Sequence, residues 1–262
     1  MRDPISLLKE SIQTFRANAK LFIGIYLIPG ALSLLLTLIT EPYTSPADYS
    51  PALTIVIVLL AIVAAVAGIL MAIAITLAAR DQSLTVMGAY QQSKPFFWQY
   101  LWLSILVGLT VIAGFVLLVI PGIIFMVWFS FAYFFLLFEG VKGVDAMKRS
   151  RELVRGRWFP VFGRFLLFFG FSLVIGFILG LIQGIGGSIS SSVVLAIPGY
   201  IIMLLVNACL SAIGILYIYG VYRDLQDSSP STVGSVGATT TPETSPLGDD
   251  QADTRGTSPQ IM

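Results

Sequence analysis

Six long apolar runs limit what this chain can fold into. They cover residues 21–39, 52–79, 98–120, 121–138, 161–184 and 198–219. An α-helix rises about 1.5 Å per residue, so about 20 apolar residues cross a hydrocarbon core roughly 30 Å thick. Because 56% of the residues are hydrophobic and only 11% are charged, one globular core could not bury all of these side chains. We therefore predict an all-α fold, a six-helix transmembrane bundle.

Two proline–glycine pairs refine this prediction. Pro121-Gly122 separates the third run from the fourth, and proline is tolerated in the first turn of a helix, where its missing N–H has no partner to lose. The two runs should therefore form a tight helical hairpin. The first run contains Pro29-Gly30, is too long for a signal peptide and has no small-x-small cleavage site, so we expect an uncleaved span.

The distribution of basic residues predicts the orientation. All 15 Lys and Arg residues lie before the first run, between the second and third, between the fourth and fifth, at the start of the fifth, or after the sixth. In a six-span arrangement these segments share one side, which the positive-inside rule assigns to the cytoplasm. We therefore expect an integral protein of a cell membrane with both termini in the cytoplasm.

The chain divides into three parts by composition. Residues 1–20 read as an amphipathic cytoplasmic helix, with Ile5, Leu8, Ile12 and Phe15 on one face. Residues 21–225 form the six-span membrane domain. Residues 226–262 are rich in Ser, Thr, Pro and Gly, and we predict a disordered cytoplasmic tail.

Similar amphipathic segments precede the third and fifth runs. Both contain a small residue, Ala89 or Ala146, four positions before a serine, and both end in an aromatic cluster. Ile-Pro-Gly opens the fourth and sixth runs. We interpret this pattern as repeated two-span units, each with an interfacial helix at the membrane surface; the alternative is chance similarity among apolar segments.

The segment between the fourth and fifth runs carries the densest positive charge. We predict that its basic face contacts anionic lipid headgroups or a protein partner, and the alternative is that it only anchors the chain. The candidate contact residues are Lys148, Arg149, Arg151, Arg155 and Arg157. Glu139, at the end of the fourth run, is expected to pair with Arg149 or Arg155 and to set the angle of this helix.

Small residues recur every four positions in the fifth run, at Ser172, Gly176, Gly180 and Gly184. Such a stripe lets another helix backbone approach closely. We expect it to pack within the chain, and a homo-oligomer surface is the alternative.

The sequence offers little for catalysis. It has no histidine and one cysteine, Cys209, so the commonest general base and metal ligand are missing, and no cofactor is expected. No charged residue lies in the middle of a run, which disfavours ion-coupled transport. We expect a non-enzymatic membrane scaffold or accessory domain, with membrane lipids and no nucleic acid as partners. The rivals are a transporter or channel for a small neutral solute, favoured by a water-filled cavity reaching Asn207 or Gln183, and a membrane-embedded lipid enzyme.

Residues 120–169 carry a family resemblance. Pro121-Gly122, the aromatic fourth run, Glu139-Gly140, Ala146-x-x-x-Ser150, Leu153-x-x-Gly156 and Trp158-Phe159 together resemble the membrane domain of glycerophosphodiester phosphodiesterases and of related stand-alone prokaryotic membrane proteins. The resemblance implies that membrane fold, and it leads us to expect the cytoplasmic membrane of a prokaryote as the location. It does not imply hydrolase activity, because the catalytic histidines of those enzymes have no counterpart here.

Overall fold

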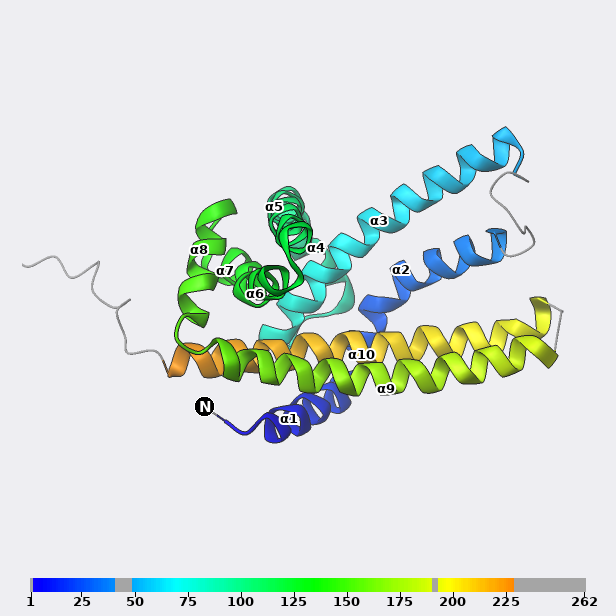
Figure 1. The fold of residues 1–262 in the computed structure, drawn as a ribbon. Coiled ribbons are helices and arrows are strands. Elements are labelled where there is room, and N and C mark those ends of the chain that lie inside the picture. Colours follow the sequence, from blue (N-terminus) through cyan, green and yellow to red (C-terminus); the bar gives the residue numbers. More distant parts are fainter. Residues whose placement is uncertain (1, 41–48, 190–192, 229–262) are drawn as a thin grey trace, which may run out of the picture. The chain divides into compact units, whose positions relative to one another are not determined.

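The computed structural model describes residues 2–40, 49–189 and 193–228, and for residues 182–189 and 193–197 it describes only the backbone. These residues form α-helices and one short 3-10 helix, with no strand among them (Figure 1). The elements are α1 (Pro4–Ala17), α2 (Ala19–Thr40), α3 (Pro51–Arg80), α4 (Val86–Ser93), η2 (Lys94–Phe96), α5 (Phe97–Leu117), α6 (Val119–Phe129), α7 (Ala132–Glu139), α8 (Gly143–Val154), α9 (Trp158–Ile189) and α10 (Val193–Asp227). The predicted disordered tail lies outside the described residues from position 229 onward.

Six helical segments of the described chain are long and apolar enough to cross a membrane. They are Ala19–Thr40, Pro51–Arg80, Val86–Leu117, Val119–Glu139, Trp158–Leu181 and Pro198–Asp227. Their length and composition are those of a multi-pass membrane protein, and they confirm the all-α, six-span fold class. The third segment includes α4 and η2, so it begins earlier than the apolar run that predicted it.

The chain reverses between α5 and α6. Leu118 is extended, with φ −167° and ψ 153°, and Pro121 lies in the first turn of α6. A Cβ atom added to Gly114 would lie 2.9 Å from the Cα atom of Gly122, so the two backbones meet where neither residue has a side chain. The predicted hairpin at Pro121 is therefore close to the observed one at Leu118, three residues earlier.

The fourth span is not one continuous helix. Ser130 and Phe131 form a turn between α6 and α7, whereas the sequence predicted an unbroken helix over 121–138. The Ser130 hydroxyl donates to the backbone carbonyl of Val127 at 2.9 Å. A serine side chain that bonds to nearby backbone in this way competes with helical hydrogen bonds. A second serine, from α8, completes the interruption, as described below.

Two apolar clusters hold the helices together, and α10 contributes to both. One cluster surrounds α7, where Phe131, Phe134 and Phe135 contact the ring of Tyr222 with centroid distances of 6.1, 5.1 and 5.5 Å. The other joins α2, α3 and α4 through residues such as Phe22 and Ile75. α9 runs antiparallel beside α10, and α1 packs against α10 (Figure 1).

A proline inside α2 explains one contact between α2 and α4. Pro29 has no N–H, so it cannot donate to the carbonyl of Ile25 one turn earlier. The hydroxyl of Tyr90, from α4, donates to that carbonyl at 2.6 Å in a buried position. Tyr90 therefore satisfies an acceptor that the proline leaves free, and it fixes α4 against α2.

The three short helices α1, α4 and α8 bury the same pattern of residues. Each buries a serine four positions after a buried apolar residue: Leu7 and Ser11, Ala89 and Ser93, Ala146 and Ser150. α1 therefore shares this buried pattern with the helices that precede the third and fifth runs. That the chain consists of repeated two-span units stays a prediction.

Candidate functional site

The densest basic segment forms the α8–α9 corner, which we define as residues 143–162. α8 buries Ala146, Met147, Ser150 and Val154 against the neighbouring helices. Gly156 follows with φ +79°, a backbone conformation that glycine adopts without steric cost, and α9 begins at Trp158. The opposite face of α8 is exposed and carries most of the predicted contact residues.

Ser150 fastens α8 into the break of the fourth span. Its hydroxyl donates to the carbonyl of Trp128 at 2.6 Å and accepts the N–H of Phe131 at 3.1 Å. These backbone groups lie at the junction of α6 and α7, where regular helical bonding stops. The Ser150 hydroxyl thus pairs with one backbone N–H and one backbone carbonyl, and it holds α8 in a fixed position.

Glu139 joins three helices at the end of α7. Its Oε2 atom lies 4.0 Å from Nη1 of Arg149, one of the two partners expected from the sequence. Its Oε1 atom accepts hydrogen bonds from the hydroxyl of Tyr222 and from Nε2 of Gln226, both at 3.0 Å. The side chains of Glu139 and Arg149 are both partly exposed, so their ion pair adds little stability. Its main effect is to orient α8.

Two further basic residues of α8 have partners within the helix or next to it. The guanidinium of Arg151 lies over the ring of Trp128, 4.5 Å from its centroid. Such a contact between a cation and an aromatic face is favourable by about 0.5–1 kcal/mol at an exposed site. Lys148 donates to Asp145 at 3.1 Å, with 68% of its side chain exposed.

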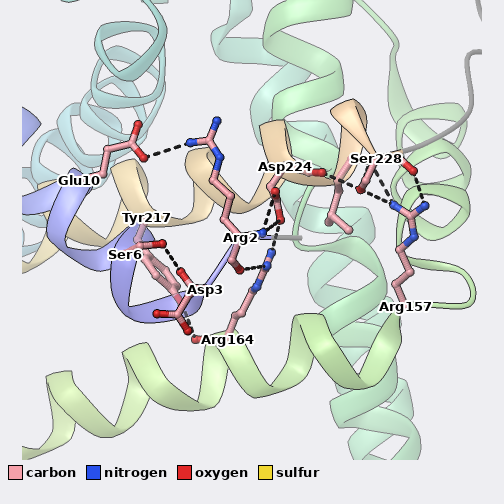
Figure 2. Close-up of polar contacts among 10 residues, drawn as sticks. Arg2, Asp3, Ser6, Glu10, Arg157, Arg164, Tyr217, Asp224 and Ser228 are labelled. Atoms are coloured by element: carbon pink, nitrogen blue, oxygen red, sulfur yellow. Dashed lines mark hydrogen bonds and ion pairs between the residues drawn. The ribbon is translucent and has the colours of Figure 1, made fainter.

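Arg157 has a structural role that the sequence did not reveal. Its Nη1 atom donates to the hydroxyl of Ser228 at 2.6 Å and to the carbonyl of Leu225 at 3.4 Å, and Nη2 donates to the Ser228 carbonyl. Arginine is favourable here because the last carbonyls of a helix lack helical partners and carry partial negative charge. Arg157 therefore caps the end of α10 (Figure 2).

Arg155 differs from the other four predicted residues. It is exposed, and its side chain has no hydrogen-bond or ion-pair partner within the described residues. It lines a groove of ≈ 610 Å³ whose other walls are almost wholly apolar: Ile120, Ile123 and Ile124 of α6, and Phe159 and Phe162 of α9. Within the part of the chain that the structure describes, Arg155 is the one charged residue lining that groove.

Trp158 adds an unpaired polar atom to the same groove. Its ring stacks on Phe162, with centroids 4.9 Å apart and planes 9° from parallel. The indole N–H is buried and has no hydrogen-bond acceptor among the residues that the structure describes. The exposed guanidinium of Arg155 is therefore the side-chain donor that the described residues offer to an anionic amphiphile in this groove, because the indole N–H is buried.

A buried ion pair near the corner was missed by the sequence analysis. Nη1 of Arg164 donates to Oδ2 of Asp224 at 2.8 Å, and the two side chains are 5% and 9% exposed. The backbone N–H of Arg2 donates to both Asp224 carboxylate oxygens at 3.1 Å, and Arg164 donates to the Arg2 carbonyl (Figure 2). The pair thus fixes the segment before α1 against the ends of α9 and α10.

One signal for this pair was present in the sequence. Arg164 lies just inside the fifth run, one turn from its start, whereas Asp224 follows the end of the sixth run. An ionisable residue at such a position generally has a partner. The tertiary structure supplies it from a position 60 residues away.

The glycine stripe of α9 does not make the close contacts expected within the chain. A Cβ atom added to Gly176 or Gly180 would have no atom within 4 Å, and the surroundings of Gly184 lie outside the described residues. α9 and α10 approach closely elsewhere, at Gly214, where an added Cβ atom would lie 2.8 Å from the ring of Phe168. At this contact α10 contributes the small residue, Gly214, and α9 contributes the bulky one, Phe168.

Comparisons with known proteins give one match. Residues 45–225, more than half of the chain, match a family described as Domain of unknown function (DUF7847). No curated protein and no solved structure matches the chain. Among the described residues, no group of three or more His, Cys, Asp or Glu side chains is arranged to hold a metal ion.

Proposed function

This chain belongs to the DUF7847 family, and we propose that it is a non-enzymatic membrane protein that holds an anionic lipid at the α8–α9 corner. In this proposal the membrane domain serves as a scaffold or accessory domain, and the lipid phosphate contacts Arg155. One acyl chain of the lipid lies in the apolar groove between α6 and α9. The basic face then lies in the cytoplasm of a prokaryotic cell, as the bias of Lys and Arg residues predicts.

The observation that carries the proposal is the combination of an apolar groove with an unpaired cation. The groove volume of ≈ 610 Å³ suits an extended hydrocarbon segment. Arg155 lies on its wall with no anionic partner among the described residues, whereas Arg149 and Lys148 have carboxylate partners. A guanidinium matches phosphate geometry with two parallel hydrogen bonds, so a phosphate is a fitting partner for Arg155.

The selectivity should come from the headgroup and not from the acyl chain. Bulk lipid offers every acyl chain an apolar environment, so filling the groove distinguishes lipids poorly. A basic residue near the surface contributes about 1 kcal/mol toward anionic lipid, which corresponds to roughly a fivefold preference. Arg155 alone should therefore produce a measurable difference between anionic and zwitterionic lipid.

The family resemblance agrees with a lipid-facing role. Residues 120–169, which resemble the membrane domain of glycerophosphodiester phosphodiesterases, include both walls of the groove and Arg155. We propose that the chain shares the membrane fold of that domain without its hydrolase activity.

Native mass spectrometry of protein extracted gently with its surrounding lipid tests the proposal. Arg155→Gln should lower the retained fraction of phosphatidylglycerol relative to phosphatidylcholine by about fivefold, if one cation contributes about 1 kcal/mol. Phe159→Ala, which removes part of the apolar wall, should lower retention of both lipids.

Lys148→Gln is the matched control. It removes one exposed positive charge of α8 that lies outside the groove and already pairs with Asp145. The proposal requires Lys148→Gln to retain phosphatidylglycerol as the wild type does. Equal loss in both variants would show a general charge effect, and the lipid-site proposal would then be wrong.

A further inference from the structure

A second cavity lies between α2, α3 and α10, away from the α8–α9 corner. Its volume is ≈ 330 Å³, and its polar lining residues are Tyr26, Ser33, Thr37, Tyr200 and Asn207. All of them belong to segments that are apolar and long enough to cross a membrane. Polar side chains at such depth generally face other helices or a water-filled space, because hydrocarbon cannot satisfy them.

Three of these side chains have unused hydrogen-bonding groups. The hydroxyls of Tyr26 and Ser33 have no hydrogen-bond partner within the described part of the chain. Nδ2 of Asn207 donates to the carbonyl of Met203 at 2.8 Å, which leaves its amide oxygen without a donor among the same residues. The cavity is therefore lined by two hydroxyls and an amide oxygen, a mixed set of donors and acceptors.

Two glycines line the cavity, and they differ in how closely other atoms approach them. Gly68 of α3 lies on its wall, and an added Cβ atom there would have no atom within 4 Å. Across the cavity, Gly30 follows Pro29, and a Cβ atom there would already lie 3.1 Å from the side chain of Leu204. The wall at Gly30 is thus tightly packed, whereas the wall at Gly68 borders empty space.

The chemistry of the lining limits the ligand. No charged residue of the described segments lines the cavity, so an ion would lose its hydration without a compensating partner there. The volume of ≈ 330 Å³ is at the low end of the range of about 300–1,000 Å³ typical of ligand pockets, and it equals the volume of roughly ten water molecules. These limits fit a small, uncharged and polar molecule.

We propose that this cavity binds a small uncharged solute bearing hydroxyl or amide groups. The solute exchanges hydrogen bonds with Tyr26, Ser33 and Asn207, and its apolar part lies against the tyrosine rings. The site is independent of the lipid site, because the two cavities share no lining residue. Either site can therefore be tested without the other.

Cysteine labelling in vesicles tests this proposal, since Cys209 is the chain's single cysteine. In a Cys209→Ser background, Gly68→Cys places a thiol on the cavity wall and keeps all three polar residues. Val66→Cys, two positions along α3 and outside the cavity lining, is the matched control. A small water-soluble maleimide labels thiols that water reaches, and glycerol, urea and acetamide serve as the solute probes.

We expect Gly68→Cys to be labelled at least fivefold faster than Val66→Cys, and at least one probe to slow that labelling severalfold. Adding Asn207→Leu and Ser33→Ala together should remove the protection. Equal labelling at positions 66 and 68, or no protection by any of the three probes, would overturn the proposal. Disulfide-linked dimers through position 68 would overturn it too, because a second copy of the chain would then occupy the cavity. Ala64→Cys, another lining position, replaces Gly68→Cys if that variant does not fold.

Discussion

Replacing Ser150 by alanine should destabilise the membrane domain substantially. Ser150 is fully buried, and its hydroxyl bonds both the Trp128 carbonyl and the Phe131 N–H. Alanine would leave one partly buried acceptor and one buried donor unpaired at the break between α6 and α7. A buried unpaired group costs about 1–3 kcal/mol and the partly buried acceptor should cost about 1 kcal/mol, so we expect the free energy of unfolding to fall by roughly 2–4 kcal/mol.

Ser93→Ala is a closely matched control for this experiment. Ser93 is also fully buried and occupies the corresponding position of α4, but its hydroxyl donates to Ala89 of the same helix, at 2.7 Å. In a helix that carbonyl also accepts the N–H four residues later, so alanine leaves no backbone group without a partner. The expected loss is below about 1 kcal/mol.

Titration with sodium dodecyl sulfate in mixed micelles, followed by circular dichroism, measures both losses. Ser150→Thr, which keeps the hydroxyl, should recover part of the stability if hydrogen bonding is the cause. If Ser150→Ala and Ser93→Ala lower the stability equally, Ser150 does not hold the break together, and our account of the fourth span is wrong.

Two further predictions use the same titration. Asp224→Asn should lower the free energy of unfolding by about 3–5 kcal/mol, because Arg164 would stay buried without its anionic partner. The double variant Arg164→Met with Asp224→Leu should recover much of that loss, because it leaves no unpaired charge. A double variant as unstable as Asp224→Asn would contradict this prediction. Tyr90→Phe should cost about 1–3 kcal/mol by leaving the Ile25 carbonyl unpaired. That cost should be smaller in a Pro29→Ala background, because an alanine N–H can donate to the same carbonyl. If Tyr90→Phe lowers the free energy of unfolding equally in both backgrounds, this explanation is wrong.

The contacts of the basic segment decide how its function can be tested. Replacing Arg149, Arg155 and Arg157 together would remove the Glu139 contact and the cap of α10 along with any lipid contact. A loss of lipid in such a variant would not distinguish binding from misfolding. Arg155 is the informative position, because it has no intramolecular partner among the described residues.

The sequence alone determined the helical class, the six spans and the approximate place of the hairpin. These properties depend on the local content of apolar residues and on helix length, since in lipid each backbone must satisfy its own hydrogen bonds. Nearness along the chain also predicted that Glu139 pairs with Arg149 or Arg155, and the structure gives Arg149.

The tertiary structure decided the properties that depend on distant partners. The break at Ser130 and Phe131 needs Ser150, and the Arg164 ion pair needs Asp224, 60 residues away. The roles of the basic residues diverge for the same reason: Arg157 caps α10, whereas Arg155 faces a groove made by α6 and α9. Hydropathy and charge patterns do not encode which side chains contact each other across helices. Those contacts distinguish a structural arginine from a candidate binding residue.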